Sequence, residues 1–151
     1  MAPELLVSAS GDESSRLSAQ EFEDFMVKVL VVDDEPHVIE ILEPYLSSRG
    51  YSVFTAGDGQ EAAEVFAREK PASVLLDLSM PGADGLSVLD WIRSQDEIVT
   101  VIVAGCTDEE ARNGALERGA DDYLVKPIDH DSLERTLHWC LKLQQACRAR
   151  F

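Results

Sequence analysis

Basic residues are scarce in this sequence of 151 residues. It contains 13 Lys and Arg against 29 Asp and Glu, which gives a formal net charge of -16 at pH 7. Affinity for nucleic acids and for anionic membrane surfaces comes largely from Lys and Arg. The charge therefore argues against direct binding to either. Apolar residues still make up 45% of the chain, which is enough to build a folded core.

Long apolar runs and paired cysteines are also missing. No stretch approaches the roughly 18 consecutive apolar residues of a membrane span. The N-terminus lacks the basic start and apolar run of a secretory signal. The three cysteines, Cys106, Cys140 and Cys147, show no Cys-x-x-Cys spacing that would indicate a metal site. We therefore expect a cytoplasmic protein with reduced thiols and no membrane contact.

The chain divides into an acidic, serine-containing tail (residues 1–26), one domain (residues 27–147) and a short C-terminal end (residues 148–151). The stretch Ser18-Ala19-Gln20-Glu21 has capping-box spacing, which predicts either a mobile tail or a short helix that runs through Phe25. The domain is expected to be complete, and the chain either stands alone or forms the front of a longer protein with an output module.

Strand-like and helix-like segments alternate five times after the tail. Short apolar runs rich in β-branched residues fall at residues 27–32, 51–54, 72–76, 99–103 and 123–125. Segments with helical apolar spacing follow each of them. Strands separated by helices of this length predict repeated βαβ units, and hence a doubly wound parallel sheet with helices on both faces.

Four charged side chains fall where strands of this sheet end. Asp33 and Asp34 follow the first strand, Asp77 follows the third and Lys126 follows the fifth. If the strand order is 2-1-3-4-5, the three carboxylates converge at the point where ligands bind in such sheets. Three carboxylates that lie so close together need a nearby cation, which could be a divalent metal or the ammonium of Lys126. Taken alone, Asp34 is equally well interpreted as the cap of the helix near Pro36.

Three motifs carry a family resemblance. The sequences Val-Leu-Val-Val-Asp-Asp-Glu-Pro (residues 29–36), Leu-Leu-Asp-Leu-Ser-Met-Pro-Gly-Ala-Asp-Gly (residues 75–85) and Gly-Ala-Asp-Asp-Tyr-Leu-Val-Lys-Pro (residues 119–127) resemble those of response-regulator receiver domains in two-component signalling. The resemblance extends over residues 28–143. It implies a flavodoxin-like, five-stranded parallel sheet in the order 2-1-3-4-5.

The resemblance also implies a role for each matching residue. Asp77 would accept a phosphoryl group from a phosphohistidine on a sensor histidine kinase or phosphotransfer protein. Mg²⁺ would be bound by Asp34 directly, by Asp33 mainly through water, and by Asp77 and the backbone carbonyl of Ser79. Lys126 would pair with a phosphoryl oxygen. Such a domain is a phosphoacceptor and assists only its own phosphorylation and dephosphorylation, so we expect no other enzymatic activity.

Ala104 departs from the family pattern, which has Thr or Ser at this position, and so removes a hydroxyl that would bind the phosphoryl group. Tyr123 matches the family's aromatic switch residue. We hypothesise that Tyr123 already points inward, or that activation relies on the loop at residues 105–108 alone. The simpler alternative is an ordinary half-buried tyrosine on a strand.

The family's usual reporting surface corresponds here to residues 109–118, 123–125 and 131–143. It would meet a downstream protein, a fused output domain or a second copy of the chain. Ala104 leaves open a different reading, a receiver-like interaction scaffold with weakened or no phosphorylation-dependent switching. A phosphatase with an aspartyl phosphoenzyme would need Asp-x-Asp after the first strand, and Asp33-Asp34-Glu35 does not supply it.

Overall fold

The computed structural model describes residue 18 and residues 26–80, 85–96 and 99–148. The helix expected to run through Phe25 and nearly all of the tail lie outside the described residues. The strands and helices alternate in the following order: β1 (Lys28–Val32), α2 (Pro36–Ser48), β2 (Ser52–Ala56), α3 (Gly59–Glu69), β3 (Ser73–Asp77), α4 (Gly85–Gln95), β4 (Thr100–Gly105), α5 (Glu109–Glu117), β5 (Asp122–Val125) and α6 (His130–Arg148).

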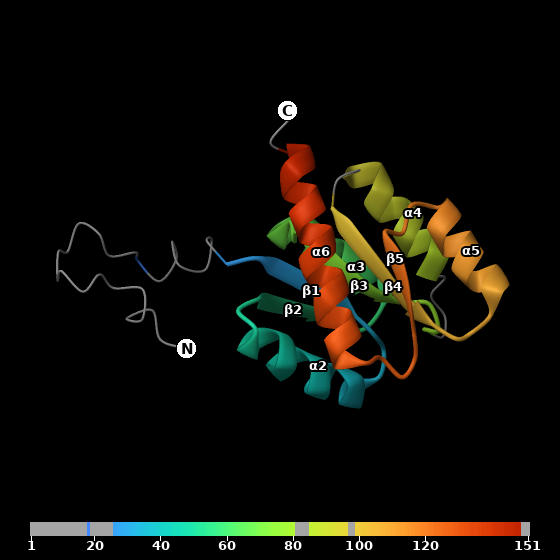
Figure 1. Ribbon diagram of the computed structural model, residues 1–151, viewed down its shortest axis with the longest axis horizontal. Coiled ribbons are helices and arrows are strands. Elements are labelled where there is room, and N and C mark those ends of the chain that lie inside the picture. The colour runs from blue at the N-terminus through green and yellow to red at the C-terminus, as the bar shows by residue number, and fades with distance from the viewer. Residues whose placement is uncertain (1–17, 19–25, 81–84, 97–98, 149–151) are drawn as a thin grey trace.

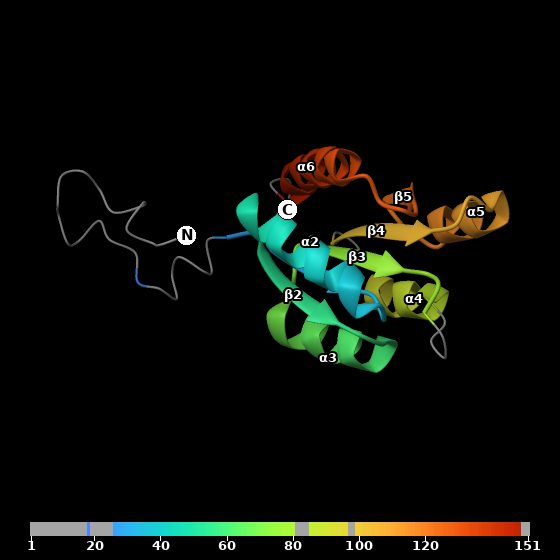
Figure 2. The same cartoon turned by 90° about the horizontal axis from the view of Figure 1, so that it is seen from below.

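The five strands form one parallel sheet in the order β2-β1-β3-β4-β5. The helices α2 and α6 cover one face of this sheet, while α3, α4 and α5 cover the other (Figures 1 and 2). The predicted flavodoxin-like, doubly wound fold is therefore confirmed. No helix among the described residues is long and apolar enough to cross a membrane.

The central strands are apolar throughout because helices cover both of their faces. In β1, the side chains of Leu30 and Val32 join the core beneath α3, α4 and α5. Val29 and Val31 point the opposite way, into the core beneath α2 and α6. This two-sided burial leaves the ends of the strands as the place for polar side chains.

Local capping explains where several helices begin. The Asp58 carboxylate accepts a hydrogen bond from the Glu61 N–H (2.8 Å) at the start of α3, as expected for an N-cap. The residue at the N-cap of α2 is Glu35, and its side chain makes no capping hydrogen bond. The interpretation of Asp34 as the N-cap of α2 was therefore wrong, and its carboxylate is available for another role.

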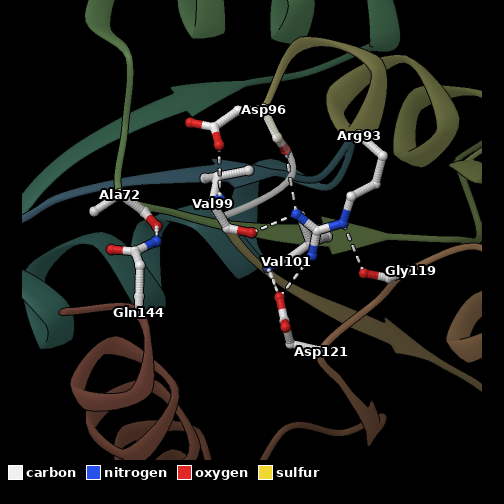
Figure 3. A network of polar contacts seen from close by, with 8 residues as sticks. All are labelled: Ala72, Arg93, Asp96, Val99, Val101, Gly119, Asp121 and Gln144. Atoms are coloured by element: carbon white, nitrogen blue, oxygen red, sulfur yellow. Dashed lines mark hydrogen bonds and ion pairs between the residues drawn. The ribbon is translucent and has the colours of Figure 1, made fainter. Parts of the chain in front are cut away.

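A network of polar contacts around Arg93 ties α4 to the edge of the sheet where β4 begins (Figure 3). The guanidinium donates to the carbonyls of Gly119 (2.8 Å) and Val99. It also pairs with the Asp121 carboxylate at 2.7 Å, which in turn accepts the Val101 N–H at 2.8 Å. These contacts join α4, β4 and the loop before β5 into one unit.

Candidate functional site

Three carboxylates meet at the carboxyl ends of β1 and β3, where the strand order reverses. Asp77 is the last residue of β3, and Asp33 and Asp34 directly follow β1, its neighbour in the sheet. One oxygen from each carboxylate lies within 4.8 Å of the others. Asp33 (3% exposed) and Asp77 (2% exposed) are buried, whereas Asp34 is exposed. We call these three residues the carboxylate cluster.

Lys126 reaches the carboxylate cluster from the end of β5. Its Nζ lies 3.1 Å from Oδ1 of Asp77 and 3.2 Å from Oδ2 of Asp33. It also lies 3.9 Å from Oε1 of Glu35. The backbone N–H of Lys126 donates to the carbonyl of Gly105 (2.8 Å), which fixes the lysine beside the end of β4. The four groups singled out in the sequence therefore lie together.

Burial and charge shape the protonation of this cluster. Burial raises the pKa of Asp33, and the nearby Asp77 charge raises it further, against the opposing effects of the Glu35 N–H and of Lys126. Burial alone would lower the pKa of Lys126. Its hydrogen bond to Asp77 and the charges of both carboxylates outweigh burial, so its pKa is raised. The Lys126 ammonium thus stays charged beside Asp33 and Asp77.

The oxygen donors suit a hard divalent cation such as Mg²⁺, which prefers one or two carboxylates and keeps several waters. The exposed side of the cluster is formed by Asp34, so an ion can approach from solvent. The backbone N–H of Ser79 donates to Oδ1 of Asp77 (2.9 Å), which orients that carboxylate. The ligand role of the Ser79 carbonyl stays a prediction.

Ala104 lies directly beside the phosphoacceptor candidate. It pairs with Asp77 across β3 and β4 and is buried (1% exposed). Its carbonyl accepts the N–H of Leu78 at 3.0 Å, so its backbone helps to hold the end of β3. The methyl side chain offers no hydrogen bond to a group on Asp77, which is the departure noted in the sequence.

Tyr123 points inward and is 7% exposed. Its hydroxyl donates a hydrogen bond to the carbonyl of Cys106 (2.8 Å), and burial raises its pKa, so it stays a protonated donor. Gly105 makes room for it, because a Cβ at that position would collide with the Tyr123 hydroxyl. The inward orientation is the one that the first version of our hypothesis requires.

Sequence reasoning missed two supporting glycines. Gly105 was considered only as part of the loop at residues 105–108, whereas it lies at the end of β4 and contacts Tyr123 of β5. Gly85 packs on the backbone next to Asp77, since a Cβ there would lie 2.9 Å from the Cα of Leu78 and 3.2 Å from the Asp77 carbonyl. The only sequence signal for Gly85 was its place at the end of the second motif.

Comparisons with known proteins agree with this geometry. The sequence profile of the response regulator receiver domain matches residues 29–138. The probable transcriptional regulator ycf27 of Porphyridium aerugineum is 42% identical over 115 residues, which cover 76% of this chain and 48% of that protein. The transcriptional regulatory protein AruR of Pseudomonas aeruginosa is 41% identical over 107 residues, covering 68% and 44%.

A solved structure with the same fold is that of NtrX from Brucella abortus. It is 30% identical and superimposes with a TM-score of 0.78, over 83% of this chain and 29% of that one. This chain spans about half the length of the curated relatives it matches.

Proposed function

The chain belongs to the response regulator receiver domain family, and on that premise we propose that Asp77 accepts a phosphoryl group from a phosphohistidine of a partner protein. The observation that carries the proposal is the placement of Lys126, whose ammonium contacts both Asp77 and Asp33 at the sheet edge. A lone buried acid would be costly to ionise. The Lys126 ammonium offsets the negative charge of the Asp77 side chain that would act as the nucleophile.

In the proposed transfer, an Asp77 carboxylate oxygen attacks the phosphorus. The new O–P bond forms as the P–N bond to the donor imidazole breaks, and the imidazole nitrogen keeps the electron pair. Lys126 stabilises the charge on the phosphoryl oxygens, and the Ser79 N–H keeps the carboxylate oriented. Catalysis then consists of positioning and electrostatic stabilisation. The domain is a phosphoacceptor and needs no further enzymatic activity.

Mg²⁺ is the cofactor that the site fits. Asp33, Asp34 and Asp77 would hold it together with the Ser79 carbonyl. When bound, it neutralises the crowded acids and the negative charge of the transferring group. The exposed position of Asp34 makes it the ligand whose substitution should disturb the fold least.

A groove beside Lys126 supports the proposal of a protein phosphodonor. It has a volume of about 490 Å³ and runs between the start of α2 and the loop before α6. Val38, Ile41 and Leu42 line one side, and Pro127 and Ile128 line the other. Ile41 is 54% exposed, so apolar surface is available next to the phosphorylation site. We propose that a histidine kinase or phosphotransfer protein docks there.

The output surface is proposed to be formed by α5, β5 and α6. The side chains of Val125, Trp139 and Leu143 are large, apolar and exposed on β5 and α6. The chain spans about half the length of its curated relatives, which are named as transcriptional regulators, so we propose an output module or a separate protein as the partner of this surface. A second copy of the chain is a further candidate.

Ala104 and Tyr123 favour a second candidate function. Because residue 104 has no hydroxyl, a phosphoryl group on Asp77 would lack one hydrogen-bond donor. Tyr123 already occupies the inward position. The domain would then act as an interaction scaffold whose output surface is set before phosphorylation. This alternative predicts that binding partners do not distinguish the phosphorylated and unphosphorylated forms.

Intact-protein mass spectrometry tests the primary proposal. The full chain is incubated with a small phosphodonor, with and without Mg²⁺, beside Asp77→Asn and a matched exposed control, Asp90→Asn. We expect a mass gain of one phosphoryl group that needs both Mg²⁺ and Asp77 and that Asp90→Asn retains. A wild-type protein that gains no mass, like Asp77→Asn, would favour the scaffold.

A further inference from the structure

A second groove lies at the opposite edge of the sheet from the carboxylate cluster, between the C-terminal halves of α3 and α4. Its volume is about 570 Å³. Its apolar lining comes from Phe66 and Ala67 of α3, from Pro71 and Ala72 before β3, and from Trp91 of α4. The Phe66 and Trp91 rings meet edge to face, with centroids 5.6 Å apart. We call this the aromatic groove.

The chain enters the domain beside the aromatic groove. The N–H of Ala72, which lines the groove, donates to the carbonyl of Lys28 at 2.9 Å. The Lys28 ammonium lies 3.3 Å from the carbonyl of Glu69, at the end of α3. All strands run parallel to one another, so β1 begins at the same edge of the sheet as β3. The segment before β1 therefore joins the domain next to the groove.

The residues just before β1 have the chemistry to fill an apolar, aromatic-lined groove. Phe22 and Phe25 are spaced three apart, among Glu21, Glu23 and Asp24. Three residues of extended chain span at most about 10 Å, which brings Phe25 within reach from Lys28. Covalent attachment also gives the segment an effective concentration of roughly millimolar, which a separate partner would not have.

One cationic and one acidic side chain line the aromatic groove. Lys70 borders the aromatic groove and is exposed, so its ammonium is available to the acids of the segment. The acidic residue of the groove, Asp96, accepts the N–H of Val99 at 3.2 Å. We propose that residues 19–25 fold back onto the domain and seat Phe22 and Phe25 in the aromatic groove. The acidic N-terminal region is thereby anchored at the edge remote from Asp77.

Fluorine NMR of the full chain tests this assignment. The protein has two tryptophans, Trp91 in the groove and Trp139, which is 63% exposed on α6. Labelling with 5-fluorotryptophan gives two resonances, which Trp139→Phe assigns. We expect Phe22→Ser combined with Phe25→Ser to shift the Trp91 resonance, leave Trp139 in place and lower Tm. The matched control, Leu5→Ser combined with Leu6→Ser, should change neither.

A change on the groove side completes a double-mutant cycle. Ala67 is exposed, so Ala67→Glu should fold, and we expect it to shift Trp91 as the tail variant does when the groove is blocked. When Ala67→Glu is added to the variant that carries Phe22→Ser and Phe25→Ser, Tm should fall no further. An unchanged Trp91 resonance in the tail variant would overturn the proposal, as would a shift of Trp139 alone. A Trp91 shift that depends on protein concentration would point to a second copy in the groove and would equally overturn it.

Discussion

The contact between Gly105 and Tyr123 makes a quantitative prediction. In Gly105→Ala, the new methyl group would occupy the space of the Tyr123 hydroxyl, so the ring must leave its buried position. That loses about 1.5–3 kcal/mol of burial and roughly 1 kcal/mol for the hydrogen bond to the Cys106 carbonyl. We expect the free energy of unfolding to fall by about 2.5–4 kcal/mol. Urea titration followed by circular dichroism measures it.

Two variants separate this collision from the general effect of replacing glycine. Gly114 lies in α5 with open space around the position of a Cβ, so Gly114→Ala should be neutral or slightly stabilising. Removing the hydroxyl with Tyr123→Phe in the Gly105→Ala protein should recover part of the loss, because the ring carbon is a more distant neighbour at 3.1 Å. If Gly105→Ala is as stable as Gly114→Ala and Tyr123 stays buried, the reasoning about this contact is wrong.

Three further predictions concern stability. Lys126→Met should lower the free energy of unfolding at pH 7 by roughly 2 kcal/mol, because two buried carboxylates lose their ammonium, and added Mg²⁺ should restore part of it in urea titrations. Arg93→Ala should cost about 2–3 kcal/mol by thermal unfolding, since the carbonyls of Val99 and Gly119 lose a charged donor. Ser73→Ala should leave stability unchanged or raise it by up to about 1 kcal/mol, because the buried Ser73 hydroxyl has no hydrogen-bond partner among the described residues. A clear loss of stability in Ser73→Ala, measured calorimetrically, would reveal a partner for that hydroxyl.

The fold was predictable because its signals are local. Each strand of the sheet is a short apolar run, and both faces of the central strands are covered, so the runs stand out from the helices between them. The exact residues at which the strands end were harder to predict from the sequence. Asp77 belongs to β3 itself, whereas the apolar run alone ended the strand at Leu76. A buried charge inside a strand is unexpected unless its partner, Lys126, is already known to be near.

The site was predictable to the extent that strand ends determine it. Parallel strands place Asp33, Asp34 and Asp77 at one edge, so their convergence follows from the strand order. The fit of Tyr123 against Gly105 does not follow from the pattern, because it depends on the rotamer of one side chain across β4 and β5.

The residues proposed for phosphoryl transfer and the residue proposed for signalling make separate contacts. The groups that would carry out transfer, Asp77 and Lys126, are held by contacts that do not involve Tyr123. A phosphoryl group can shift a conformational equilibrium only by the difference in its contacts with the two states. Ala104 supplies no hydroxyl for such a contact, while the hydrogen bond to Cys106 and burial over Gly105 already favour the inward tyrosine. We therefore expect any response of α5, β5 and α6 to phosphorylation to come from the backbone at the end of β4, where the Gly105 carbonyl accepts the N–H of Lys126.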